Sequence, residues 1–378
     1  MSEKITATIQ EHFGDVEDPR RTYLNEHPLI NILTIALCAI IAGAEGWTDV
    51  ENFGKQKAAW LGQFLNLQNG IPSHDTFGRV FARLDPQSFR QSFLSWVQAV
   101  FEVTDGQVIA LDGKTLRRSH DKAAGKEAIC MVSAWATANH LVLGQVKVET
   151  KSNEITAIPV LLAMLDLSGC IVTIDAIGTQ TEIAQQIVDQ GGDYLLPVKE
   201  NQKQLYEDVQ LFFKLAQQNE FAKVTHTYHR TANGGHGRIE VRQCWAISGA
   251  DSLSFLRGED RWPRLQCIVM IQSERRLSGK VEQQTNYFIT SLPNDAQTIL
   301  EAKRSHWGIE NGLHWVLDVS FREDDSRVRQ GNADQNLAIL RHMALNLLKQ
   351  ERTAKGGIKA KRLQAAWNED YLVKVLLG

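Results

Sequence analysis

Three acidic residues occupy positions where carboxylates could support phosphoryl transfer. Asp112 follows the apolar run QVIAL, Asp175 follows CIVTI, and Glu310 lies in the helical pattern HWGIENGLHW. Two divalent cations about 3.5–4 Å apart can stabilise both the attacking and the leaving oxygen of an in-line displacement at phosphorus. Mg²⁺ prefers carboxylates, water and phosphate oxygens as ligands. Three carboxylates are therefore an adequate ligand set, and no His or Cys ligand is required.

The order of elements between residues 105 and 222 predicts that the first two acids lie close together. Three strands (QVIALD, AICMVSAWAT and LVLGQVKVE) precede a helix, the strand CIVTID, a second helix, the strand DYLLPV and a third helix. This order fits a ribonuclease H-like core, in which the first and fourth strands are neighbours and present Asp112 and Asp175 together. Each acid alone equally fits a turn or an ion pair, so the hypothesis depends on their joint placement.

The segment around Glu310 has a pattern of its own. His306, Glu310 and His314 are spaced by four residues and share one helix face. Gly308 and Gly312 form a second such pair, and each costs about 1 kcal/mol relative to Ala in a helix. The pair predicts close approach of another backbone, or tight packing against the sheet. The rival candidates for the third acid are Asp318, Glu323, Asp324 and Asp325.

The remaining segments predict an α/β protein of several parts. Residues 1–100 read as an all-helical N-terminal domain, with helices at Leu29–Ala44, from an Asp49 cap to about Leu65, and after a Ser73 cap. These helices fit a DNA-binding helix-turn-helix or any small bundle. Residues 223–292 form a β-rich insertion, and Asn294 can cap the long helix that follows. The catalytic domain then comprises 105–222 and 293–350.

The last part, residues 351–378, is predicted as a basic tail. From Arg341 to Gly378 there are eight Lys or Arg and three acids, although the whole chain has a net charge of -3. The excess of positive charge fits contact with phosphate, or simply a solvated helix face.

Composition excludes several other classes. Hydrophobic residues make up 43% of the chain, and its longest apolar stretch, ILTIALCAIIAGA, is shorter than a membrane span. Because the N-terminus also has no apolar signal core, we expect a cytoplasmic protein. The five cysteines form no CxxC pair and are expected to be reduced core residues. His226, His229 and His236 lack the Cys partners and closed spacing of a zinc site.

Long motifs link this sequence to a known family. The segments ALDGKTLRRS, KSNEITAIPVLLAMLDLSGCIVTIDAIGTQ, GGDYLLPVKENQKQLYEDV and SHWGIENGLHWVLDVSFREDDSRVR resemble the H-repeat-associated proteins, which are bacterial insertion-sequence transposases of the DDE class. The resemblance implies a metal-binding triad of Asp112, Asp175 and Glu310 that holds two Mg²⁺ or Mn²⁺ ions with DNA bound. It also implies cleavage and joining of double-stranded DNA at terminal inverted repeats and target, by a homodimer associated with the nucleoid.

The family signature is not kept at every position. Relatives carry Tyr, Arg and Lys around the third acid where this sequence has Lys303, His306 and Leu317. Glu154 is expected to cap a helix, and Trp245 and Trp262 are expected to pack in the core. The residues expected to contact DNA are Lys114, Arg117, Arg118, Lys199, Asn201, Arg304, His306, Arg327 and Arg329.

Two alternative functions remain open. One is a metal-dependent nuclease on the same fold that cuts DNA without joining it. The other is a catalytically silent DNA-binding remnant of a mobile element. Joined products, or inverted repeats flanking the coding region, would favour the transposase. Neither a membrane nor a small-molecule substrate is expected.

Overall fold

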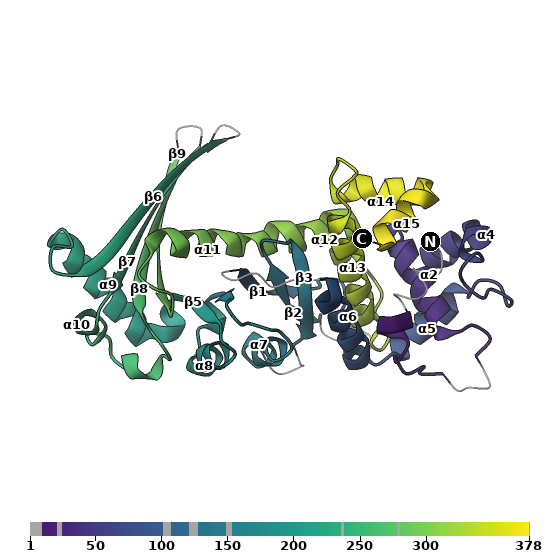
Figure 1. Cartoon of the computed structure of the whole chain (residues 1–378), viewed down its shortest axis with the longest axis horizontal. Helices are drawn as coiled ribbons and strands as arrows, with labels where there is room; N and C mark the ends of the chain where they lie inside the picture. Colours follow the sequence, from purple (N-terminus) through teal and green to yellow (C-terminus); the bar gives the residue numbers. More distant parts are fainter. Residues whose placement is uncertain are drawn as a thin grey trace.

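The protein is an elongated mixed α/β molecule, with a large sheet towards one end and a helical body at the other (Figure 1). The computed structural model describes residues 10–20, 25–100, 107–120, 128–148, 153–235, 238–277 and 280–377. The sequence-based expectation of a mixed α/β chain with a helical N-terminal region is confirmed.

One nine-stranded sheet organises the half of the molecule that carries the acids. Its strand order is β3-β2-β1-β4-β5-β9-β8-β7-β6. β1 pairs antiparallel with β2 and parallel with β4, and β4 pairs parallel with β5. The strands are β1 (Val108–Thr115), β2 (Cys130–Ala136), β3 (Leu141–Lys147), β4 (Ile171–Thr173), β5 (Asp193–Val198), β6 (Thr225–Gly235), β7 (Arg238–Ser248), β8 (Cys267–Leu277) and β9 (Lys280–Thr290).

The segment expected as a β-rich insertion continues this sheet. β9 pairs antiparallel with β5, from Leu195 opposite Thr290 to Val198 opposite Tyr287. β6 to β9 then form a long antiparallel meander that projects beyond the rest of the molecule (Figure 1). The four predicted strands of this segment are confirmed, and they extend the same hydrogen-bonded sheet.

Helices cover both faces of the sheet. α7 (Glu154–Leu162) and α8 (Thr181–Asp189) lie on one face, while α11 (Ala296–Ile309) crosses the other towards the helical body (Figure 1). α9 (Lys203–Gln218) and the short α10 (Ala250–Leu253) lie near the base of the meander (Figure 1). A π-helical turn, η5 (Glu310–His314), joins α11 to α12 (Trp315–Phe321).

The cap of α11 differs from the prediction. Asp295 precedes the helix, and its carboxylate accepts hydrogen bonds from the backbone N–H of Gln297 at 2.9 Å and of Thr298 at 3.4 Å. Asn294 instead bonds to Thr227 Oγ1 at 2.8 Å, which ties the helix start to β6. The predicted Asn294 cap is therefore wrong, because the carboxylate of Asp295 caps the helix instead.

The helical body combines both ends of the chain. Helix α13 lies at its centre, and nearly all of its side chains are buried. Asn336 of α13 donates from its side chain to the carbonyl oxygens of Phe81 at 2.8 Å and of Leu84 at 3.0 Å. The helices of this body are α2 (Leu29–Ile41), α3 (Trp47–Gln56), α4 (Ala58–Leu61), α5 (His74–Arg83), α6 (Pro86–Val100), α13 (Ala333–Gln350), α14 (Ile358–Trp367) and α15 (Glu369–Leu377). The predicted helical region therefore shares one core with residues far away in the sequence.

Two predicted N-caps in this body have different outcomes. The Ser73 hydroxyl accepts the backbone N–H of Thr76 at 3.3 Å, so that prediction is confirmed. Asp49 lies inside α3, where its carboxylate accepts the backbone N–H of Gly46 at 3.2 Å. The predicted Asp49 helix is therefore wrong at both ends, because α3 begins at Trp47 and the chain turns after Gln56.

The basic C-terminal segment forms α14 and α15, and two of its cations are buried. Lys361 Nζ donates to the carbonyl oxygen of Leu348 at 2.9 Å. Arg362 donates to the carbonyl oxygens of Ile40 and Ala44. These two side chains bind backbone within the helical body, so contact with phosphate is left to the exposed residues. Those are Arg352, Lys355, Lys359 and Lys374.

The longest apolar stretch is a core element. It forms α2, whose side chains are almost all buried. Among the described residues, no helix has both the length and the apolar character that crossing a membrane requires. Cys38, Cys244 and Cys267 are buried as expected, and burial raises the pKa of each thiol to about 12.

Candidate functional site

The sheet brings Asp112 and Asp175 together. The parallel pairing of β1 with β4 ends at Ala110 opposite Thr173, and two further residues along each chain lead to the two acids. Asp112 lies inside β1, where it pairs with Ser133 of β2, because β1 continues along β2 after leaving β4. The expectation that Asp112 ends its strand is therefore wrong. Its closeness to Asp175, which follows β4 by two residues, nevertheless arises from the predicted strand order.

The two carboxylates influence each other. Burial raises the pKa of Asp175 above its ordinary value, and the negative charge of Asp112 raises it further. The backbone N–H groups of Gly178 and Ile177 act in the opposite direction by donating to Asp175. Like charges gathered in a partly buried place disfavour ionisation, and a bound cation would relieve this repulsion.

Glu154 is a further acid beside Asp112 and Asp175, although the sequence had predicted only a capping role for it. Glu154 was expected to cap α7, but Asn153 caps it by accepting the backbone N–H of Ile155 at 3.1 Å. The pKa of Glu154 is raised by burial and then by the charges of Asp175 and Asp112.

Gly113 provides the space that Glu154 occupies. A Cβ at position 113 would lie 2.1 Å from Glu154 Oε1, so a larger residue there would displace the carboxylate. The glycine directly after Asp112, inside a strand, was the signal in the sequence that another group approaches closely.

Glu310 lies at the start of the π-helical turn η5. Its side chain is exposed and lines a cavity of about 220 Å³ together with Asp175, Lys199 and His306. It has no ion-pair partner among the residues that the structure describes. π-helical turns are rare and frequently occur at functional sites. The cavity therefore joins the predicted third acid to one of the two acids from the sheet.

Two histidines on the same helical segment face the sheet. His306 Nδ1 lies 2.9 Å from Thr173 Oγ1, and His314 Nε2 lies 3.3 Å from Asp112 Oδ2. Burial lowers the pKa of His306, while the charge of Asp112 opposes that shift. The neutral form of His306 is thus favoured. A neutral His306 ring can orient neighbouring groups through hydrogen bonds, as it does with Thr173.

The two glycines of this segment pack against an indole. A Cβ at Gly308 would lie 3.4 Å from Trp135 Nε1, and one at Gly312 would lie 2.8 Å from Trp135 Cζ2. The close neighbour is therefore a buried side chain from β2, and the alternative of tight packing against the sheet is correct. The expected approach of another backbone is wrong.

Gly312→Ala is expected to destabilise the fold by about 1–3 kcal/mol, because the added methyl group overpacks a rigid contact. Trp135 is completely buried and cannot swing away. Urea unfolding would measure the change. Gly357→Ala is the matched control, since no atom lies within 4 Å of a Cβ at that position and its φ of -71° suits any residue. Equal stability of the two variants would contradict the packing argument.

Asp318 and Glu323, two of the rival candidates for the third acid, form ion pairs with Lys114, which was predicted to contact DNA. Lys114 Nζ lies 2.5 Å from Asp318 Oδ1 and 2.9 Å from Glu323 Oε2. Lys114 and Glu323 are both largely buried. The expectation that Lys114 holds a DNA phosphate is not supported, because its ammonium group already forms ion pairs with two carboxylates.

The other rival acids are also paired. Arg117 Nε lies 3.3 Å from Asp324 Oδ2, and Arg118 Nη1 lies 3.2 Å from Asp325 Oδ1. These pairs are more exposed than the Lys114 pairs, so both arginines can exchange partners. Glu310 differs from all four rivals in lining the cavity and in forming no ion pair with a described residue.

The remaining predicted DNA contacts lie in several parts of the structure. Lys199 is exposed and lines the cavity beside Asp175. Asn201 donates from its side chain to the carbonyl oxygen of Ala176 at 2.5 Å, which holds the turn after Asp175. Arg329 Nε donates to the carbonyl oxygen of Arg118 at 2.8 Å. Arg304 and Arg327 are exposed.

The aromatic and histidine residues outside the cavity have structural surroundings. Trp262 is only 4% exposed, and Trp245 stacks on Phe221 with ring centroids 6.1 Å apart. Both fit the core packing expected from the sequence. The ring of His226 lies against Phe221 at 5.0 Å. His236 lies outside the described residues.

Comparison with known proteins agrees with the motifs. The model described as "Transposase DDE domain" matches residues 103–347, and the model described as "DDE_Tnp_1-associated" matches residues 10–97. "H repeat-associated putative transposase YhhI" of Escherichia coli K12 is 40% identical over 98% of both chains. "Putative transposase YncI" of Escherichia coli O157:H7 is 41% identical over 98% of this chain and 94% of its own.

A comparison of structures adds little. A cryo-EM structure of the piggyBac transposase synaptic complex with hairpin DNA aligns with 99% of this chain and 80% of its own. Its identity is 11% and its TM-score is 0.41, which is too low for an argument about this protein.

The matched domains, which span most of the chain, define the class of this protein: it is a DDE transposase. Within that class, its full-length similarity to the H-repeat-associated relatives is extensive. The chain belongs to the H-repeat-associated family of bacterial insertion-sequence transposases.

Proposed function

We propose that this protein cuts DNA at the ends of an insertion sequence and joins the freed ends to a target, using Asp112, Asp175 and Glu310 to hold divalent metal ions. The observation that carries the proposal is that Asp112 and Asp175 each lie two residues beyond the last parallel pair of β1 with β4, with Glu310 lining the cavity beside Asp175. These carboxylates would bind a metal ion, and the ion in turn would bind a DNA phosphate.

The strand order supports a ribonuclease H-like core. The part β3-β2-β1-β4-β5, with only β2 antiparallel to both of its neighbours, has the order expected of that fold. In an open sheet, ligands bind at the carboxyl ends of parallel strands. Asp112 and Asp175 follow the point where the parallel pairing of β1 with β4 ends.

The donor atoms fit Mg²⁺ or Mn²⁺, which favour carboxylate oxygens. Within the described part of the chain, no three His, Cys, Asp or Glu side chains lie close enough together to enclose an ion. Phosphate oxygens and water therefore have to complete the ligand set, as is usual for Mg²⁺. Bound ions would polarise the scissile phosphate and lower the pKa of the attacking water.

The protein's own residues position these groups. His314 Nε2 lies 3.3 Å from Asp112 Oδ2, close enough to attract its carboxylate when the ring is protonated. His306 is held by Thr173 and lines the cavity, so its other ring nitrogen can bind a phosphate oxygen or a water. Lys199 adds positive charge beside Asp175, where the DNA backbone would pass.

The partners proposed are the terminal inverted repeats and a target duplex. Because two ends must be held at once, we propose that the protein acts as a homodimer on DNA. Arg304 and Arg327 are exposed cations near the cavity and on the segment after α12, and both are proposed to contact phosphate.

Asp175→Asn is expected to abolish metal-dependent cleavage of labelled DNA that carries the element's ends, because it removes a metal ligand and keeps the side-chain volume. The assay would follow cut and joined products separately in Mg²⁺ or Mn²⁺. Asp189→Asn, an exposed acid on α8, is the matched control and should retain activity.

Cleavage that survives in Asp175→Asn would remove this residue from the proposed triad. Products that are cut but never joined would favour a nuclease on the same fold. Binding without cleavage by the unaltered protein would favour a silent element.

A further inference from the structure

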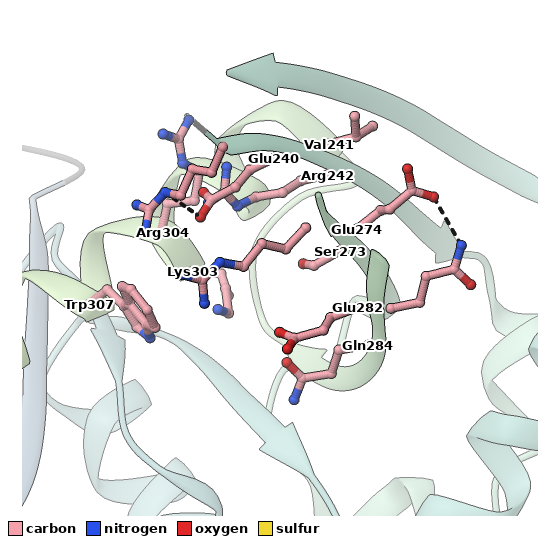
Figure 2. A pocket seen from close by; sticks show the side chains of 13 residues that line it. Glu240, Val241, Arg242, Ser273, Glu274, Glu282, Gln284, Lys303, Arg304 and Trp307 are labelled. Carbon is pink, nitrogen blue, oxygen red and sulfur yellow. Dashed lines mark hydrogen bonds and ion pairs between the residues drawn. The ribbon is translucent and has the colours of Figure 1, made fainter. Parts of the chain in front are cut away.

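The helical segment that carries Glu310 is supported unevenly along its length. The first turns of α11 pack in an apolar cluster with strands of the sheet. Further along, a pocket of about 540 Å³ separates the helix from β7, β8 and β9, with Lys303, Arg304 and Trp307 on the helix side (Figure 2). The meander therefore gives the helix little support just before Glu310, and contacts with β1 and β2 have to set the position of this acid.

Two side chains of β1 face this segment. Asp112 and Lys114 are two residues apart on a strand, so they project to the same side of the sheet. Their partners His314 and Asp318 are four residues apart and lie on one side of the helical segment. His314 Nε2 lies 3.3 Å from Asp112 Oδ2, and Lys114 Nζ lies 2.5 Å from Asp318 Oδ1. These two contacts link the strand of the first acid to the helix of the third.

The Lys114 contact continues into the helical body. Lys114 Nζ also lies 2.9 Å from Glu323 Oε2, and Glu323 Oε1 lies 3.8 Å from Arg341 Nη1 of α13. The side chains of Lys114, Glu323 and Arg341 are 12%, 2% and 3% exposed. Burial lowers the pKa of the neighbouring His342 to about 4, so this imidazole adds no charge. With Asp318, two cations and two carboxylates therefore balance each other where little water reaches.

A buried ionic group of this kind is not an efficient way to stabilise a fold. Removing charges from water is costly, and well-packed apolar side chains often serve stability as well. The best-attested use of buried polar groups is to fix one register between packed elements. Here those elements are β1 and α12, and a slide of α12 by one residue would move Glu310 by about 1.5 Å. A displacement of about 1 Å at a reacting centre can lower a rate about 100-fold.

We infer that Lys114, Asp318 and Glu323 form a buried ionic clamp, which fixes the helical segment of Glu310 against the strand of Asp112. Lys114 is thus a positioning residue for the carboxylates, and it acts through the helix instead of through a DNA phosphate. The effect on catalysis rests on the proposed function, whereas the clamp itself does not.

The double variant Lys114→Met with Asp318→Asn tests the clamp. It removes one charge of each sign and leaves Glu323 beside Arg341, so no uncompensated buried charge remains. Its midpoint in urea unfolding should therefore stay close to that of the unaltered protein. Lys114→Met alone leaves two carboxylates without their shared cation, and it should unfold at a lower urea concentration than the double variant.

Amide hydrogen exchange of the protein without metal or DNA measures the clamp directly. In the double variant, peptides from η5 and α12 should exchange roughly tenfold faster or more, the effect of losing a charged hydrogen bond. Peptides from α2 should keep their protection, because its side chains are buried elsewhere in the helical body. Asp318→Asn alone keeps Lys114 paired with Glu323 and should show a smaller increase in the same peptides.

Cleavage of DNA supplies a readout that a purely structural role would not change. The double variant should cut labelled element ends about 100-fold more slowly in a single turnover, and it should need more Mn²⁺ to reach half of its maximal rate. Lys57→Met with Glu369→Gln is the matched control, because Lys57 Nζ lies 3.0 Å from Glu369 Oε1 within the helical body. This control should keep the exchange of η5 and α12, the cleavage rate and the Mn²⁺ requirement.

Unchanged exchange in η5 and α12 would overturn the inference, whether or not cleavage falls. Faster exchange spread equally over α2, α12 and α13 would also overturn it, since that result indicates a loss of overall stability alone. Faster local exchange with cleavage at the unaltered rate would remove the positioning role of Lys114. If exchange responds as expected but the unaltered protein never cleaves DNA, only the proposed catalysis is contradicted.

Discussion

Glu310→Gln is expected to lower metal-dependent cleavage of the element's ends by about 1,000-fold or more. A metal ligand contributes several kcal/mol of transition-state stabilisation, and each 1.36 kcal/mol changes the rate tenfold. Glu310 is exposed, lines the cavity with Asp175 and forms no ion pair among the described residues, although Lys303 lies near enough to interact with its charge. Its replacement should therefore leave the stability of the fold within about 0.5 kcal/mol. Cleavage would be measured as a single-turnover rate on labelled DNA.

Glu301→Gln is the control for this experiment, because Glu301 is an exposed acid on the same helix that lies outside the cavity. It should cleave at the unaltered rate. If the Glu310→Gln variant retains cleavage, Glu310 is not the third metal-binding acid. Glu154 would then become the next acid to test, since it lies beside Asp112 and Asp175.

Arg362→Met should lower the free energy of unfolding by about 3 kcal/mol or more, since each buried acceptor left unsatisfied costs about 1–3 kcal/mol. Arg362 Nη2 donates to the carbonyl oxygens of Ile40 at 2.8 Å and of Ala44 at 3.2 Å. Its guanidinium also donates to Ser320 and lies over the ring of Phe321 at 4.1 Å. Methionine can replace the packing but none of the hydrogen bonds.

Urea unfolding followed by circular dichroism would measure this loss. Lys359→Met on the same helix is the control, because Lys359 is exposed and its replacement should change stability by no more than about 0.5 kcal/mol. If both variants unfold at the same urea concentration, the hydrogen bonds of Arg362 do not stabilise the helical body as expected.

The sequence predicted the sheet well where local patterns determine it. The strand DYLLPV is β5 without change, and AICMVSAWAT and LVLGQVKVE contain β2 and β3. Strand order could be inferred because few topologies accommodate three strands followed by alternating helices and strands. The predicted strand order therefore also predicted that Asp112 lies beside Asp175.

The features that were missed depend on contacts between distant residues. Glu154 has the local pattern of a helix start, and only the packing of α7 against β2, which pairs with β1, brings it to Asp112. Lys114 follows a candidate metal ligand in the sequence, but its partners Asp318 and Glu323 come from about 200 residues later. The π-helical turn at Glu310 was likewise not predicted, and its glycine neighbours pack against Trp135 from a distant strand.

The shared core of the helical body has a consequence for the order of synthesis. Helices α2 to α6 are made first, but α13 to α15, which complete their core, are made last. The side-chain hydrogen bonds from Arg362 to the carbonyl oxygens of Ile40 and Ala44 also form only after the last helices are made. The N-terminal helices therefore cannot reach their final stability while the ribosome is still translating the sheet. A messenger broken before α13 would yield a chain in which helices α2 to α6 lack their packing partner.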